Sequence, residues 1–237
     1  MSKWQPRGPI AALAGTEDTE HSACVHTTMV GNVAVVTING PLDTRGGDAS
    51  YEEIYKALSD ARGADAIVLD LDSPGGSAAG MVECARACRA LPLPAVVAVA
   101  NYYACSAAYA IACIADVIAA PPSATVGSIG VRGGHVSWAR ANDMQGYDVR
   151  NVSSGALKLD GDPTSPIDED ALAREASTVN NLAEDFFAWV QERRGFDPRA
   201  LEGSAVLGKD AVALKLTDKI ATLGQVLGEL ISLRKGK

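Results

Sequence analysis

The stretch from Ala95 to Ala112 constrains the possible folds of this chain more than any other. Its first part, Ala95–Ala100, is a continuous apolar run, which is typical of a strand buried on both faces of a parallel sheet. The last part consists almost wholly of small residues, which predicts a short helix that packs closely against its neighbours. Ser106 lies at the junction, where a serine usually caps the helix that follows.

Apolar runs and helical patterns alternate through the first half of the chain. Strands are predicted at Val33–Ile38, Ala66–Leu71, Ala95–Ala100 and Asp116–Ala119, and helices after Ser50, up to about Ala90 and up to about Ile114. This alternation predicts an α/β fold with a mainly parallel sheet flanked by helices. Functional groups gather at the carboxyl ends of such strands, where the turns Ser73–Ser77 and Asn101–Ser106 both fall.

Turn residues and helical spacing predict the remaining elements. Gly31-Asn32 follows a β-like run at Cys24–Val30 and indicates a tight hairpin. Also predicted are a helix around His135–Met144, a strand at Tyr147–Val152, a long helix capped by Ser165 and ended by Gly195, a short strand near Lys215–Ile220 and a final helix. Residues 1–22 are interpreted as a loosely ordered N-terminal arm, and residues 23–237 as a single domain with C-terminal helices.

Charge and composition argue against several classes of function. The formal net charge is −8 and no large basic cluster occurs, so we expect no nucleic-acid partner and no membrane partner. The absence of a long apolar run and of a hydrophobic signal core predicts a cytoplasmic protein. The cysteines form no CxxC pair, which is typical of free thiols. Cys84 and Cys88 have a spacing that suits a metal, but no histidine lies near them in the sequence, so no metal is expected.

A serine nucleophile needs a base, and the three histidines are poor candidates. His135 follows two glycines on a turn predicted to be exposed, and the other two lie in or beside the N-terminal segment. A lysine can replace histidine where burial lowers its pKa enough to leave the amine neutral. Lys158 is the only lysine between Lys56 and Lys209. The alternative is that Lys158 is an ordinary solvated loop lysine.

The glycine pair Gly75-Gly76 and the residue Cys105 each allow two interpretations. Gly75-Gly76 follows a predicted buried strand, so its N–H groups could face a ligand, or the pair could simply form a tight turn. The run around these glycines has neither the Gly-Lys-Ser/Thr ending of a phosphate loop nor the GxGxxG pattern. Cys105 could act as a thiol nucleophile in place of Ser106, although small buried cysteines are common in protein cores.

Four motifs occur in order along the chain. They are Asp70-Leu-Asp-Ser-Pro-Gly-Gly-Ser77, Tyr102-Tyr-Ala-Cys-Ser-Ala-Ala-Tyr109, Thr125-Val-Gly-Ser-Ile-Gly-Val131 and Ser154-Gly-Ala-Leu-Lys158. Together they resemble the signal peptide peptidase A family of Ser–Lys peptidases, and most closely its bacteriophage branch, the head-maturation (prohead) proteases. The resemblance covers roughly residues 30–222. It implies a Clp protease/crotonase-like fold, in which repeated β-β-α units build the sheet.

The resemblance implies a role for the polar residue of each of three motifs. Ser106 matches the nucleophile, and Lys158 matches the general base that takes its proton and later returns it to the leaving amine. Ser128 matches the serine that hydrogen-bonds to the lysine and orients it. Such a Ser–Lys pair is a variant of the serine triad, so no cofactor is expected.

The resemblance also implies an oxyanion hole beside the nucleophile. The Gly75-Gly76 turn matches this feature, with the N–H of Gly76 as the expected donor. The amide of Ala107, directly after the nucleophile, is a further candidate. A helix N-terminus at this point would favour negative charge on the serine and on the oxyanion.

The function implied by the resemblance is that of a serine endopeptidase in phage or prophage capsid maturation. Its expected partners are protein or peptide substrates, with scaffold and major capsid protein foremost, and further copies of the chain in a homo-oligomer. Such an enzyme would act in the cytoplasm of the bacterial host or inside the procapsid. No membrane anchor is recognised in the sequence, which argues against membrane signal peptides as substrates.

Three alternatives remain open. One is a cytosolic protease of the host that resembles signal peptide peptidases. Another is a catalytically lapsed module that binds scaffold, although the motif residues Ser106, Ser128 and Lys158 are all present. The third is an acyl-CoA enzyme of the enoyl-CoA hydratase type, which would share the fold and would not need Lys158.

Overall fold

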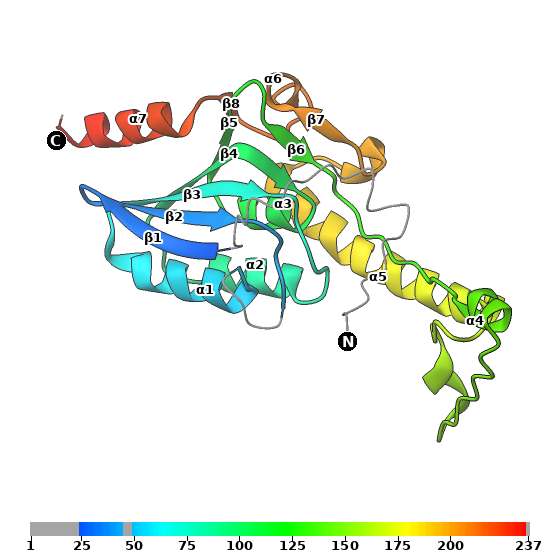
Figure 1. Ribbon diagram of the computed structural model, residues 1–237. Helices are drawn as coiled ribbons and strands as arrows, with labels where there is room; N and C mark the ends of the chain where they lie inside the picture. The colour runs from blue at the N-terminus through cyan, green and yellow to red at the C-terminus, as the bar shows by residue number, and fades with distance from the viewer. Residues whose placement is uncertain (1–23, 45–48, 236–237) are drawn as a thin grey trace.

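The computed structural model describes residues 24–44 and 49–235, and the predicted arm at residues 1–22 lies outside these ranges. Its centre is an 8-stranded sheet with strand order β1-β2-β3-β4-β5-β8, while β6 pairs with β4 and with β7 (Figure 1). The strands are β1 (Cys24–Val30), β2 (Val33–Asn39), β3 (Ala66–Ser73), β4 (Ala95–Cys105), β5 (Val117–Ala120), β6 (Thr125–Gly127), β7 (Ala205–Leu207) and β8 (Lys219–Ile220). The β1–β2 and β6–β7 pairs are antiparallel and the other pairs are parallel, which confirms the predicted fold class.

The hydrophobic pattern explains which strands are central. β2, β3 and β4 carry long apolar runs, so both faces of these strands can be buried. The predicted hairpin is confirmed, because Val30 pairs with Val33 and Gly31 between them has a φ of 62°. No sequence pattern predicts β6 and β7, because three residues are too few to show an alternation.

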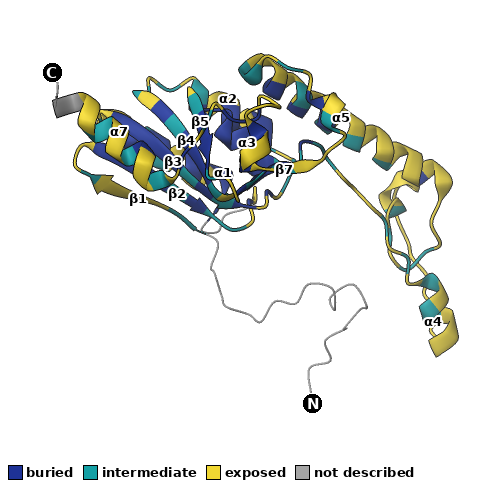
Figure 2. Ribbon diagram, turned by 90° about the horizontal axis from the view of Figure 1, so that it is seen from above, coloured by how far each residue is buried: buried dark blue, intermediate teal, exposed yellow. Residues whose placement is uncertain are grey.

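Helices cover both faces of the sheet. They are α1 (Tyr51–Asp60), α2 (Met81–Arg89), α3 (Ala107–Ala112), α4 (Ala139–Gln145), α5 (Glu169–Arg194), α6 (Gly208–Ala211) and α7 (Leu223–Lys235), with 3-10 helices η1 (Ala61–Gly63), η2 (Ala156–Leu159) and η3 (Pro198–Leu201). α1, α2 and α3 pack on one face of the sheet, and α7 packs on the other (Figures 1 and 2). Within the described ranges, no helix is both long enough and apolar enough to cross a membrane.

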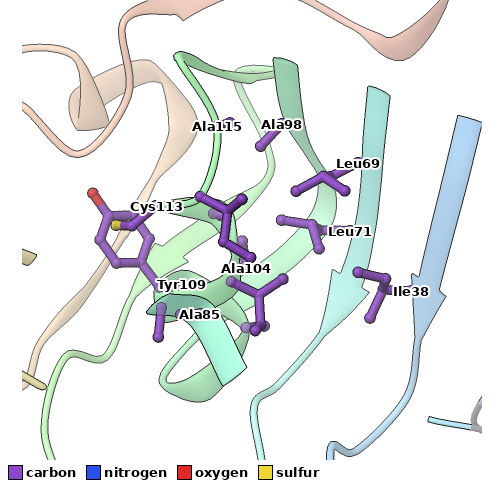
Figure 3. Packing of buried hydrophobic residues seen from close by; sticks show 14 of the residues in the cluster. Ile38, Leu69, Leu71, Ala85, Ala98, Ala104, Tyr109, Cys113 and Ala115 are labelled. Carbon is purple, nitrogen blue, oxygen red and sulfur yellow. The ribbon is translucent and has the colours of Figure 1, made fainter. Parts of the chain in front are cut away.

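α3 lies in the middle of the main core. All six of its residues are buried, and its small side chains let α2, α5 and β4 approach closely (Figure 3). The Tyr109 hydroxyl donates a hydrogen bond to the Leu216 carbonyl (2.8 Å), and the indole N–H of Trp189 donates to the Ala110 carbonyl (2.9 Å). These bonds fix the helix, and with it the position of the residue at its start.

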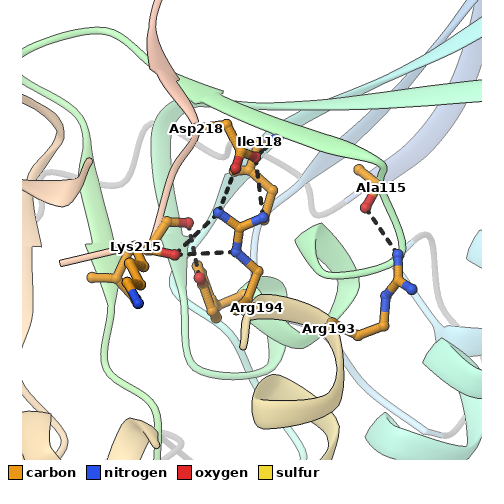
Figure 4. Close-up of polar contacts among 8 residues, drawn as sticks. Ala115, Ile118, Arg193, Arg194, Lys215 and Asp218 are labelled. Atoms are coloured by element: carbon orange, nitrogen blue, oxygen red, sulfur yellow. Dashed lines mark hydrogen bonds and ion pairs between the residues drawn. The ribbon is translucent and has the colours of Figure 1, made fainter. Parts of the chain in front are cut away.

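An arginine near the end of α5 joins this helix to the sheet. The Arg194 guanidinium donates to both carboxylate oxygens of Asp218 and to the Lys215 carbonyl (Figure 4). Asp218 also accepts a hydrogen bond from the Ile118 amide of β5 (2.7 Å). The C-terminal half of α5 is therefore anchored in the body of the protein.

Residues 131–168 form a projection that extends away from the sheet beside the N-terminal half of α5 (Figures 1 and 2). It contains α4 and η2. Arg174 of α5 is ion-paired with Asp160 (2.6 Å), and Glu175 accepts a hydrogen bond from the Gly134 amide (2.8 Å). These contacts hold the projection on α5 rather than on the body, and most of its side chains are exposed.

Two sequence predictions in this region are wrong. Tyr147–Val152 forms no strand, because no other described strand lies beside it to pair with its backbone. The long helix begins at Glu169 instead of directly after Ser165, because Asp168 supplies the cap by accepting from the Asp170 amide (3.0 Å).

Candidate active site

Ser106 lies between β4 and α3 in an unusual backbone conformation. Its φ is 52° and its ψ is −124°, whereas a helix-capping residue normally has an extended backbone. Ser106 occupies the cap position as predicted, but its hydroxyl makes no capping hydrogen bond. The side chain therefore has no role in starting the helix. A non-glycine residue held at positive φ is costly and is found preferentially at functional sites.

Gly75 allows the turn after β3 to pack directly against Ser106. A Cβ atom added to Gly75 would lie 2.7 Å from the Ser106 Cβ and 2.9 Å from the Ala107 nitrogen, which is closer than real Cβ atoms approach. The φ of Gly75 is 98°, which also favours glycine. The two turns that follow β3 and β4 are therefore in contact.

Gly76 is held from the opposite side by Leu42. The Leu42 amide donates to the Gly75 carbonyl, and the Ser77 amide donates to the Leu42 carbonyl, each at 2.9 Å. In this parallel bridge the N–H of Gly76 points away from Leu42, toward the side on which β4 and α3 lie. A Cβ on Gly76 would lie 1.9 Å from the Leu42 carbonyl oxygen, so only glycine fits.

Ser128 follows β6 in the same way that Ser106 follows β4. Cys105 lies opposite Gly127 in the β4–β6 pair, and the Ser106 amide donates to the Gly127 carbonyl (2.8 Å). Both serines have a φ of 52°. They therefore lie next to each other at the ends of parallel strands, which run about 5 Å apart.

One cleft of about 760 Å³ is lined by both serines and by the glycine turn. Its lining residues are Pro74, Gly75, Gly76, Ser77, Ala78, Ser106, Ser128, Gly130, Val131, Arg132 and Gly203. Ala107 is buried at the first position of α3, and the first turn does not use its N–H, since Tyr109 and Ala110 donate to the Ser106 carbonyl. A carbonyl placed against Ser106 would thus meet backbone N–H donors, which is what stabilisation of an oxyanion requires.

Lys158 is the one predicted site side chain that the structure does not bring to this cleft. It lies exposed in η2, on the projection, and is not among the residues that line the cleft. Its neighbour Asp160 is paired with Arg174, and about 18 Å of helix separates Arg174 from Phe186, where α5 enters the core. The structure therefore places Lys158 on the projection, while Ser106 and Ser128 lie at the cleft.

The sequence does not single out two further residues at the site. Arg132 lines the cleft, and the only available signal is that it directly follows the motif ending at Val131. Tyr51 of α1 is buried, and its hydroxyl donates a hydrogen bond to the Ser77 carbonyl, which helps to hold the glycine turn in place. Burial raises the pKa of Tyr51, so its hydroxyl stays protonated and remains a donor.

The other residues considered as nucleophile, base or metal ligands do not lie open to the cleft. They are Cys105, His135, Cys84 and Cys88. Cys105 is buried, its thiol donates to a backbone carbonyl, and burial raises the pKa of that thiol. His135 lies on the projection, with Nε2 3.2 Å from the Asp162 carbonyl, beside a separate cavity of about 660 Å³. The sulfur atoms of Cys84 and Cys88 are 3.9 Å apart, and among the residues described no third metal-ligating side chain joins them.

Comparison with known proteins finds similarity to peptidases. Residues 93–236 match peptidase family S49. Capsid assembly protease C of Escherichia phage lambda is 30% identical over 223 residues, which are 88% of this chain and 51% of the phage protein. Head-tail preconnector protein GP5 of Enterobacteria phage P21 is 36% identical over 145 residues, or 56% and 29% of the two chains.

A bacterial protein shows a comparable similarity. Probable protease SohB of Haemophilus influenzae is 28% identical over 222 residues, which are 90% of this chain and 60% of that protein. The chain therefore matches about half the length of the lambda protein and 29% to 60% of the length of these three relatives.

Proposed function

The chain belongs to peptidase family S49, and on this premise we propose that it is a serine endopeptidase with Ser106 as its nucleophile. The family also accounts for the Clp protease/crotonase-like fold of its mostly parallel sheet. The observation that carries the proposal is the backbone of Ser106, whose positive φ frees its hydroxyl from capping at the edge of a cleft.

The proposed reaction follows from the groups around Ser106. The Ser106 oxygen attacks the carbonyl carbon of the scissile peptide bond, and its proton passes to the side-chain amine of Lys158. The Gly76 and Ala107 N–H groups stabilise the resulting oxyanion. Collapse of this intermediate releases the amine product, which takes the proton from the lysine and leaves an acyl-enzyme. Water then attacks the acyl-enzyme by the same route, and Ser128 orients the lysine throughout.

The base is supplied by the Lys158 of a neighbouring copy of the chain. Support comes from the placement of this lysine, which is exposed on a projection and separated from the cleft of its own chain. The projection and the adjoining start of α5 also expose many large apolar side chains: Val136, Trp138, Met144, Tyr147, Val149, Val152, Leu157, Ile167 and Leu172. Monomeric proteins rarely expose so many together, and contact with a second copy would cover them.

The biological substrates that fit best are capsid and scaffold proteins of a phage or prophage. Two of the similar proteins are named as a capsid assembly protease and a head-tail preconnector protein, both from phages. A housekeeping protease of a bacterial host is the second candidate, and the similarity to a probable bacterial protease favours it. Co-expression with neighbouring capsid and scaffold genes distinguishes the two, because only the first predicts cleavage of those proteins.

Substitution of the nucleophile tests the proposed chemistry. Ser106→Ala should abolish cleavage of a denatured protein substrate and labelling by a fluorophosphonate probe, while leaving the fold unchanged by circular dichroism. Cys105→Ala is the matched control and should retain both activities. Cleavage that persists in a clean Ser106→Ala preparation would contradict the proposal. Labelling also separates a working peptidase from a lapsed module or an acyl-CoA enzyme.

A further inference from the structure

We propose that Arg132 forms a subsite for a carboxylate side chain of the protein substrate, so that the enzyme prefers Asp or Glu a few residues from the bond it cleaves. The proposal rests on the proposed function of the cleft, since it concerns the same site. It adds a preference for acidic residues in the substrate, which the catalytic groups do not provide by themselves.

Arg132 is placed at the end of an open wall of the cleft. The segment from Ser128 to Arg132 continues the line of β6 without belonging to a helix or strand, and its members Gly130 and Val131 also line the cleft. A Cβ on Gly130 would meet no atom within 4 Å, so a substrate backbone can approach this wall closely. An extended chain covers about 3.3 Å per residue, so Arg132 lies up to about 13 Å along the wall from Ser128.

The charge of Arg132 has no counterpart among the residues that the structure describes. Of the described residues that line the cleft, it is the only charged one. Its guanidinium makes no ion pair or hydrogen bond with any residue in the described ranges, whereas Arg174 and Arg194 both bind carboxylates. A guanidinium binds a carboxylate through two parallel hydrogen bonds, which gives geometric selectivity as well as charge attraction. An acidic side chain of the substrate is the partner that this cation lacks.

The net charge of the whole chain cannot explain a preference for acidic substrates, so the charge of Arg132 has to supply it. The formal net charge is −8, so an acidic peptide gains nothing from the overall field of the protein. Any preference for acidic residues must therefore come from a cation in the cleft itself. Because Arg132 is exposed, screening by salt should weaken the preference.

Cleavage-site profiling measures the proposed preference directly. A denatured, unstructured protein such as casein is digested, and the cut sites are identified by mass spectrometry of the peptides. The wild-type enzyme should show Asp or Glu enriched about two- to fivefold at one position within roughly five residues of the cut, as expected for a solvent-accessible charged pair. The enrichment should fall when the salt concentration is raised from 0.05 to 0.5 M.

Charge reversal gives the sharpest form of this test. Arg132→Gln should remove the acidic enrichment at that position, and Arg132→Glu should replace it with enrichment of Lys or Arg. Arg62→Glu is the matched control, because Arg62 lies in η1 near the opposite end of the sheet, and its profile should equal that of the wild type. All variants should keep their circular dichroism spectrum, since the Arg132 side chain is exposed.

The two proposals fail in distinguishable ways. If Ser106-dependent cleavage occurs without acidic enrichment, or if Arg132→Glu leaves the profile unchanged, the subsite is overturned and the peptidase assignment stands. If no variant and no wild-type preparation shows Ser106-dependent cleavage, the proposed function fails and the subsite fails with it.

Discussion

The positive φ of Ser106 and the missing side chain of Gly75 depend on each other. In the observed conformation the Ser106 Cβ lies 2.7 Å from the position that a Gly75 Cβ would take, so the two turns can pack together only if residue 75 is glycine. Ser106, the proposed nucleophile, and the glycine turn, the proposed oxyanion hole, are therefore positioned by the same contact. A change at Gly75 must disturb both.

Gly75→Ala should reduce kcat/KM roughly 100-fold or more, because displacement of a reacting group by about 1 Å has an effect of this size. Gly31→Ala is the matched control, since Gly31 also has a positive φ but its Cβ would meet no atom within 4 Å. The control should lose about 1 kcal/mol of folding free energy and keep its activity. Urea unfolding and peptide kinetics of the two variants check this prediction. Equal kinetic losses in both would contradict it.

At the scale of elements, the turn between β3 and α2 is clamped from two directions. Leu42, after β2, binds the backbone on either side of Gly76, and Tyr51 of α1 donates to the Ser77 carbonyl. The turn carries no helix or strand of its own at this point. Its shape, and so the direction of the Gly76 N–H, depends on these contacts.

Tyr51→Phe should lower kcat about three- to tenfold with little change in KM, because the oxyanion donor acts mainly in the transition state. The loss of one buried hydrogen bond should also cost about 1 kcal/mol of folding free energy. Tyr55→Phe is the matched control on the same helix, where the side chain is 41% exposed, and it should behave as the wild type. A rise in KM with unchanged kcat would show that Tyr51 does not position the catalytic turn.

Sequence patterns predicted most elements of the body and the motifs of the cleft. The apolar runs of β2 to β5 and the glycine turn were recognisable because burial and tight turns restrict residue type locally. The backbone of Ser106 was not predictable, since a serine before a helix usually caps it. The strand predicted at Tyr147–Val152 failed because an alternating pattern does not show whether a neighbouring strand exists. The position of Lys158 depends on how the projection leaves the body, which no local pattern encodes.

At the scale of the whole molecule, the proposed nucleophile and the proposed base lie on different parts of one chain. Ser106 lines the cleft, while Lys158 lies on the projection, which also exposes many apolar side chains. These two features are explained together if the projection of one copy reaches the cleft of another. Activity should then depend on assembly.

Trp138→Ser should raise the protein concentration needed for half-maximal specific activity at least about tenfold, because a large exposed aromatic residue at an interface carries much of the binding energy. Analytical ultracentrifugation should show the same shift in assembly. Met29→Ser is the matched control, since Met29 is 55% exposed but lies on β1, away from the projection. Specific activity that is independent of concentration in both proteins, with both monomeric, would contradict the assembly requirement.

Mixing two inactive variants shows whether Ser106 of one copy works with Lys158 of another. Ser106→Ala and Lys158→Ala chains, each inactive alone, are co-expressed with different tags and purified together through both tags. An equal mixture should recover about a quarter of wild-type turnover, because half of the sites carry Ser106 and half of those have a neighbour with Lys158. A mixture that assembles normally but stays inactive would contradict it.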